Sequence, residues 1–124
     1  MSQKISPKAG VARIGYALFY SWSGLKTVWM TQAAFRQEVI LLSIGFPVSF
    51  ILETSVMGKL MMAASGILLL IVELLNSAIE FAIDRSGLEY HILSKYAKDA
   101  ASAAVFLTFL LTCGIWATVL IVGV

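Results

Sequence analysis

The chain has 124 residues, of which 60% are hydrophobic and 13% are charged, and its mean hydropathy is +0.90. Such a chain has too few polar residues to cover the surface of a water-soluble domain. The composition therefore excludes a soluble globular protein and predicts a single membrane domain. The formal net charge of +2 says little by itself, and no nucleic-acid partner is expected. Cys113 is the only cysteine and lies in an apolar run, so an internal disulfide is excluded, and a small buried hydrophobe is its expected role.

The N-terminal third reads as a polar start followed by an amphipathic helix. Residues 1–10 are polar and contain Pro7, and Arg13 interrupts the only early apolar run, so no signal peptide is expected. We expect a helix over 11–37, because apolar residues recur there at intervals of three or four: Val11, Ile14, Leu18, Trp22, Leu25 and Trp29. Aromatic and basic residues around that stripe favour a helix lying in the membrane interface. The alternative is a soluble amphipathic helix, which the apolar segment that follows argues against.

A first transmembrane helix is expected over 38–53. Its uncharged part, Val39 to Leu52, contains Pro47 and covers only about 21 Å as a helix, against a hydrocarbon core of roughly 30 Å. The span must therefore borrow residues at its ends, thin the bilayer or pack tightly against other helices.

Two further transmembrane helices are expected over 58–84 and 99–123. Each contains a cluster of small residues that lets helices approach closely, Ala63 to Gly66 in the first and Ala100 to Ala104 in the second. Between them, 84–99 is predicted to be a short polar connection in which Gly87 permits a break.

The basic residues predict the orientation. Eight of the nine Lys and Arg residues precede the first span or lie between the second and third, and Lys59 is the exception. The N-terminus is therefore expected in the cytoplasm and the C-terminus outside.

A polar stripe interrupts the second span. At about 100° per residue, its members fall within roughly 100° of arc: Glu73, Asn76, Ser77, Glu80 and Asp84. Ionisable residues at membrane depth usually mark a functional site. The alternative is a helix end emerging into water, which would not need Asn76 and Ser77 on the carboxylate face.

The stripe suits a reaction between a membrane-embedded hydroxyl and a soluble metal–nucleotide. Measured from Lys59, Glu73 lies about 20 Å and Glu80 about 30 Å along the helix. The deeper carboxylate suits proton exchange and the shallower one a hard cation, with Asn76 between them. Lys98, beside Asp99, could contact phosphate as a point charge.

Other readings of these residues remain open. Proton or cation transport would require polar residues toward the outer side, but Leu60 to Val72 offers only Ser65. His91 could be a ligand or base, or an ordinary surface residue beside Tyr90. No P-loop or protein-kinase glycine-rich loop is present, which excludes a conventional nucleotide-binding fold.

Glu73-Leu-Leu-Asn-Ser-Ala-Ile-Glu-Phe-Ala-Ile-Asp84 resembles the signature of the small prokaryotic diacylglycerol kinases, a family that includes undecaprenol kinases. The resemblance extends over nearly the whole chain through four further blocks: Tyr20-Ser-Trp-x-Gly-Leu25, Ala33-Ala-Phe-Arg-Gln-Glu38, Glu89-Tyr-His91 and Ala97-Lys-Asp99. It implies an all-α homotrimer, each subunit with a surface helix and three transmembrane helices, in the bacterial inner membrane. It also implies phosphorylation of diacylglycerol to phosphatidic acid by ATP and Mg²⁺, in active sites shared between subunits.

The resemblance implies a role for each matching residue. Glu73 would be the catalytic base and contact the lipid, Asn76 a positioning group and Glu80 a metal ligand. The other nucleotide-binding residues would be Arg13, Tyr20, Gln32, Glu89, His91, Lys98 and Asp99. The remaining lipid-binding residues would be Trp22, Arg36 and Ser102.

Gln32 departs from the family pattern, which has a glutamate there that shares the metal with the residue matching Glu80. An amide can coordinate through oxygen but supplies no charge, so lower metal affinity is expected. Glu38, Glu89 or the nucleotide could compensate, the protein could be less active, or the residue could be an alteration. A lipid kinase is the first hypothesis; an undecaprenol kinase, an ion- or proton-conducting oligomer and a non-catalytic assembly subunit are the alternatives.

Overall fold

The computed structural model describes residues 10–124 and consists there of four helices without a strand. They are α1 (Val11–Thr31), α2 (Ala33–Ile51), α3 (Val56–Arg85) and α4 (Ile92–Val122). The polar start expected before residue 10 lies outside the described residues.

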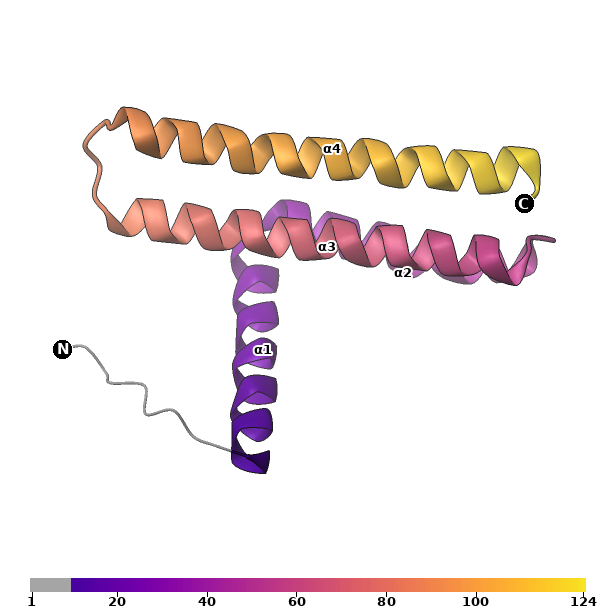
Figure 1. Cartoon of the computed structure of the whole chain (residues 1–124), viewed down its shortest axis with the longest axis horizontal. Coiled ribbons are helices and arrows are strands. Elements are labelled where there is room, and N and C mark those ends of the chain that lie inside the picture. The colour runs from indigo at the N-terminus through magenta and orange to yellow at the C-terminus, as the bar shows by residue number, and fades with distance from the viewer. Residues whose placement is uncertain (1–9) are drawn as a thin grey trace.

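Helices α2, α3 and α4 run side by side, and α1 lies crosswise to them (Figure 1). Each of these three helices, α2, α3 and α4, is long and apolar enough to cross a membrane. If they do, α1 lies along the membrane surface, as the sequence predicts. The apolar stripe of α1 is exposed and is therefore available to lipid. The only buried residue of α1 is Val28, which lies outside the stripe. The expected all-helical architecture with one amphipathic helix and three spans is confirmed.

The helix boundaries differ from the expected ranges at two places. The first helix ends at Thr31 and α2 begins at Ala33, so the break falls at Gln32 rather than after residue 37. Arg36 explains this position: its Nη1 donates to the carbonyl oxygens of Trp29 (2.8 Å) and Met30 (3.2 Å), which are free at the end of α1. The first span thereby starts five residues earlier than expected, and its helix of 19 residues is long enough to cross the membrane.

The last helix begins seven residues before the expected start at 99. The Nδ1 atom of His91 accepts a hydrogen bond from the backbone N–H of Leu93 at 3.1 Å and so caps α4. The connection from α3 is therefore only residues 86–91. Gly87 adopts a φ of +116°, which confirms the predicted break, because a left-handed conformation favours glycine.

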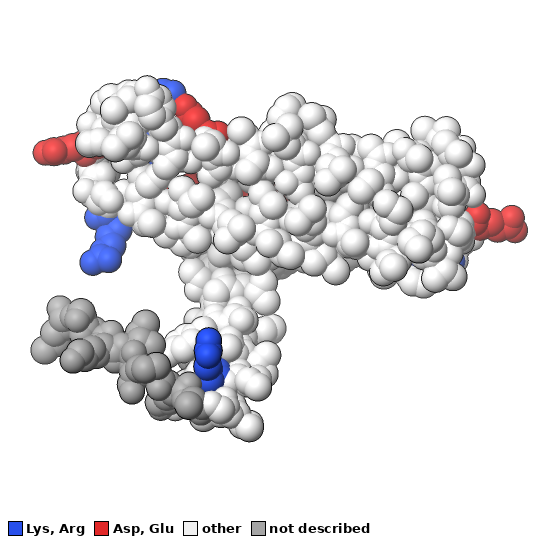
Figure 2. All heavy atoms as spheres, in the orientation of Figure 1, with Lys and Arg blue, Asp and Glu red and all other residues white. Residues whose placement is uncertain are grey.

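Charged atoms gather at the two ends of the bundle and on α1, and the visible flank between the ends is almost entirely uncharged (Figure 2). Few large side chains are buried, and most apolar ones are exposed. This distribution is the reverse of that of a water-soluble protein and fits a chain whose apolar surface faces lipid or other subunits.

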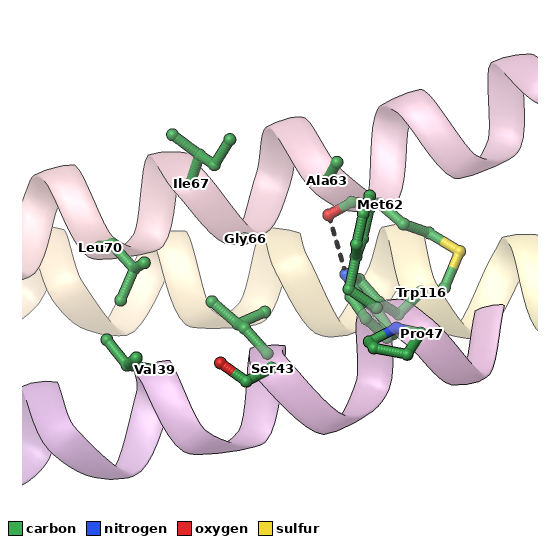
Figure 3. A pocket seen from close by; sticks show the side chains of 11 residues that line it. Val39, Ser43, Pro47, Met62, Ala63, Gly66, Ile67, Leu70 and Trp116 are labelled. Carbon is green, nitrogen blue, oxygen red and sulfur yellow. Dashed lines mark hydrogen bonds between the residues drawn. The ribbon is translucent and has the colours of Figure 1, made fainter. Parts of the chain in front are cut away.

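Trp116 on α4 contacts both other helices of the bundle, α2 and α3 (Figure 3). Its Nε1 donates to the carbonyl oxygen of Met62 on α3 at 3.2 Å, and its ring lies against Gly45 on α2. Thr112, one turn before it, donates to the carbonyl oxygen of Ser65 at 3.2 Å. An apolar groove of about 420 Å³ between α2 and α3 ends at this ring and extends to Val39 and Leu70.

Gly45→Ala is expected to lower the free energy of unfolding by about 1–3 kcal/mol, as overpacking commonly does. An added Cβ would lie 2.8 Å and 2.9 Å from two ring carbons of Trp116. The ring cannot move away without losing its hydrogen bond to Met62. Thermal unfolding in detergent measures the effect.

Gly114→Ala is the matched control, because an added Cβ at Gly114 meets nothing within 4 Å in the described chain. Alanine also forms helix better than glycine, so this variant should unfold at the same temperature or higher. Equal midpoints for the two variants would show that the space beside Gly45 is not tight.

Candidate functional site

The polar stripe of α3 runs from a buried carboxylate to an exposed one. Glu73 is only 4% exposed, Asn76 and Glu80 are half-buried, and Asp84 is exposed. Asn76 Nδ2 donates to Glu80 Oε1 over a long 3.4 Å, so the amide and the shallower carboxylate are aligned along the helix. The gradient follows from the straight helix, because each turn brings the next stripe residue closer to the end of the bundle.

Ser77 lies next to Glu73 at the buried end of the stripe and is itself fully buried. Its hydroxyl donates to the backbone carbonyl oxygen of Glu73 at 2.9 Å. The Ser77 side chain is thus satisfied within its own helix and leaves the Glu73 carboxylate free for another partner.

Glu38 on α2 is a second acid beside Glu73, close enough for their charges to repel. Its Oε2 atom is buried and has no hydrogen-bond partner among the described residues. The sequence had suggested Glu38 only as a possible compensation for Gln32. The missed signal was an acid within the first turns of a membrane span, where charge is expensive. Val39 and Leu70 line one end of the apolar groove; Val39 follows Glu38 in the chain, and Leu70 lies one turn before Glu73, so this end of the groove is close to the acid pair.

The exposed end of the stripe faces the start of α4. Lys98 Nζ lies 2.9 Å from Asp84 Oδ1, and one turn earlier Lys95 pairs with Asp99. A hollow of about 850 Å³ lies around the connection between the two helices, lined by Asp84, Glu89, His91, Lys95, Lys98 and Asp99 among others. Four of the residues proposed for the nucleotide thus share one hollow: Glu89, His91, Lys98 and Asp99.

The remaining candidates lie apart from this hollow. Arg13, Tyr20 and Trp22 are exposed on the crosswise helix α1, where Tyr20 packs edge-on against Phe19. Ser102 is exposed on α4. Arg36 binds the end of α1, and no hydrogen bond or ion pair in residues 10–124 joins any of them to the α3 stripe.

Gln32 is half-buried at the elbow between α1 and α2, and its side chain makes no capping hydrogen bond. Within residues 10–124, no hydrogen bond joins it to Glu80, and no group of three or more His, Cys, Asp or Glu side chains is placed to hold a metal. These residues cannot form a site in which protein side chains supply all the metal ligands. Magnesium fits, because it is usually bound by one or two carboxylates with water and phosphate oxygens supplying the rest, and Glu80 offers such a carboxylate.

The structure is that of a multi-pass helical membrane protein, because three apolar helices are long enough to span a membrane. Its polar site lies at one end of the bundle, where the acidic residues of α3 reach the charged hollow. Residues 19–120 match the family model described as prokaryotic diacylglycerol kinase. The chain belongs to this family.

Proteins named diacylglycerol kinase from three bacteria are similar to this chain. The one from Pseudomonas aeruginosa is 46% identical over 114 residues, 92% of this chain and 93% of that protein. The one from Escherichia coli is 40% identical over 111 residues, with 90% and 91% covered. The one from Helicobacter pylori is 40% identical over 114 residues, with 91% and 89% covered. The resemblance found in the sequence is therefore confirmed over nearly the full length of each chain.

Proposed function

We propose that this chain is a diacylglycerol kinase, which transfers the γ-phosphoryl group of ATP to the free hydroxyl of diacylglycerol and gives phosphatidic acid and ADP. The observation that carries the proposal is the course of the α3 stripe. It begins at a buried acid beside an apolar groove and ends at a charged, exposed hollow. One substrate of this reaction is dissolved in the bilayer and the other in water, so its site needs both ends.

Glu73 is the base in this proposal. Its carboxylate accepts the proton of the lipid hydroxyl as the oxygen attacks the γ-phosphorus and the bond to ADP breaks. The lipid contacts include Trp22 and Arg36 from the α1–α2 region, and Ser102 from α4. Asn76 holds the Glu80 side chain through the hydrogen bond between them.

The nucleotide occupies the hollow at the start of α4 in this proposal, with Glu89, His91, Lys98 and Asp99 around it. Glu80 would hold Mg²⁺ together with Gln32, and the ion would neutralise charge on the phosphates. Arg13 and Tyr20 complete the set from α1.

The same hypothesis includes a homotrimer with active sites shared between subunits. It is supported by the exposed apolar surface of the bundle and by the course of α1, most of which extends away from the bundle of its own chain (Figure 1). We further propose insertion in the bacterial inner membrane with the N-terminus in the cytoplasm. The end of the bundle with the hollow then faces cytoplasmic ATP, and the C-terminus lies in the periplasm.

Ion conduction has less support, because the polar stripe of α3 does not continue from Glu73 toward the start of that helix. Ser65 is the only polar side chain from Leu60 to Val72, and its hydroxyl donates to the carbonyl oxygen of Met62 at 2.9 Å. Ser65 is buried, and its backbone carbonyl oxygen accepts a hydrogen bond from Thr112.

Purified protein in mixed micelles with diacylglycerol, ATP and Mg²⁺ is expected to form phosphatidic acid. Undecaprenol replaces diacylglycerol in a parallel reaction, and the faster acceptor identifies the substrate class. Light scattering of the same preparation should give three chains per particle. Absence of any phosphorylated lipid across several lipid and metal conditions would rule out the kinase.

A further inference from the structure

Asp84 is the last residue of the α3 stripe and has no role in the reaction described so far. Its Oδ1 lies 2.9 Å from Lys98 Nζ, 14 residues further along the chain. This is the only ion pair between α3 and α4 in residues 10–124, because the other, Lys95 with Asp99, lies within α4. The contact therefore joins the acid stripe to the charged start of the next helix.

Lys98 is bonded to Asp84 and is attracted more weakly by a second acid of the stripe. Besides its bond to Asp84, its ammonium is close enough to Glu80, one turn earlier on α3, for attraction between the charges. Asp84 and Lys98 both line the hollow in which the nucleotide is proposed to bind. The ammonium is thus held on the side of the hollow nearest the stripe.

Stability alone does not account for the pair. Both side chains are about half exposed or more, and exposed ion pairs contribute little to folding. The contact does restrict a long, flexible side chain, which otherwise loses conformational entropy when it binds a ligand. An ammonium has three N–H donors, and Asp84 takes one of them, so the others remain available to phosphate oxygens.

We propose that Asp84 is a positioning residue that holds the Lys98 ammonium in place for the nucleotide phosphates. The inference rests on the proposed kinase function and on the nucleotide site at the start of α4. Asp84 acts through Lys98 and need not touch the nucleotide, and its charge is screened from the phosphates by the lysine between them.

Asp84→Asn is expected to raise KM for Mg-ATP by about tenfold, because the side chain keeps its shape but loses its charge. The kcat should change by less than about twofold and KM for diacylglycerol not at all, because the acid pair at Glu73 is untouched. Asp84→Glu keeps the carboxylate and should restore most of the affinity. Glu53→Gln, the same kind of charge removal in an exposed residue of the α2–α3 turn, is the control and should behave as wild type.

A double-mutant cycle tests whether Asp84 acts through Lys98. The measured quantity is equilibrium binding of a fluorescent, non-hydrolysable ATP analogue with Mg²⁺ to the intact protein in detergent. Asp84→Asn should weaken binding about tenfold in the wild-type background. In Lys98→Met it should not weaken binding further, and binding there can only become stronger, because the carboxylate is no longer screened from the phosphates by the lysine. Equal weakening in both backgrounds, or an unchanged affinity in Asp84→Asn, would overturn the inference.

The two proposals fail differently. A wild-type protein that binds the nucleotide but phosphorylates no lipid contradicts the kinase, while the binding cycle still decides the role of Asp84. An active wild-type protein with the same KM for Mg-ATP in Asp84→Asn contradicts the positioning role alone. Equal unfolding temperatures of the wild type and Asp84→Asn would show that a change in binding is not a folding defect.

Discussion

Glu73→Gln is expected to lower the rate of lipid phosphorylation by about 10²–10⁴-fold, the usual cost of losing a general base. Glutamine keeps the shape of the side chain but cannot accept the proton of the acceptor hydroxyl. Nucleotide binding should persist, because the hollow at the start of α4 lies more than two turns away along α3. Initial rates of phosphatidic acid formation at saturating substrates, with nucleotide binding measured separately, test both parts.

Folding should survive in Glu73→Gln, because the variant removes a charge that is 4% exposed and has a second acid beside it. Glu53→Gln serves as the control, since it makes the same chemical change in an exposed residue outside the site. Turnover at the wild-type rate in Glu73→Gln would mean that another group, with Glu38 the nearest acid in α2, is the base.

Gln32→Glu is expected to increase the apparent affinity for Mg²⁺ by about one to two orders of magnitude. A second carboxylate about 4 Å from the ion adds a Coulomb attraction of order 4 kcal/mol at an effective dielectric constant of 20. Desolvation of the new carboxylate cancels part of this gain. The phosphorylation rate against free Mg²⁺ measures the change, and saturating Mg²⁺ should bring the two proteins together if the charge acts on metal binding.

Gln37→Glu is the matched control, because it makes the same substitution at an exposed position of α2. It should leave the Mg²⁺ dependence unchanged. Curves for Gln32→Glu that superimpose on those of the wild type would place position 32 outside the metal site, and the expected pairing of Gln32 with Glu80 would then be dropped.

The α3 stripe could be predicted because its geometry is local. A period of 3.6 residues places Glu73, Asn76 and Glu80 on one face whatever surrounds the helix, and the run of apolar residues before them sets their depth. The break at Gly87 is equally local, since only the backbone of that residue must adopt a left-handed conformation.

The helix boundaries could not be predicted as well, because distant side chains decide them. The elbow at Gln32 depends on Arg36 reaching back to the carbonyl groups of α1, and the early start of α4 depends on the side chain of His91. Arg36 was expected to lie in the surface helix, yet it belongs to the helix of the first span.

Contacts between helices could not be predicted from the sequence. The approach of Glu38 to Glu73 and the pair of Asp84 with Lys98 both depend on how α3 packs against its neighbours. Helical periodicity places a residue on a face, but it does not say which residue of another helix lies opposite.

The uninterrupted course of α3 has a consequence for the choice of acceptor lipid. Seven residues separate Glu73 from Glu80, so the helix fixes a rise of about 10 Å between them. A thicker or thinner bilayer shifts both carboxylates together and leaves this interval unchanged. If Glu73 is the base, as proposed, the helix itself sets the depth at which an acceptor hydroxyl must lie. A lipid whose hydroxyl rests at another level would then reach Glu73 only at an energetic cost, whatever the fit of its tails.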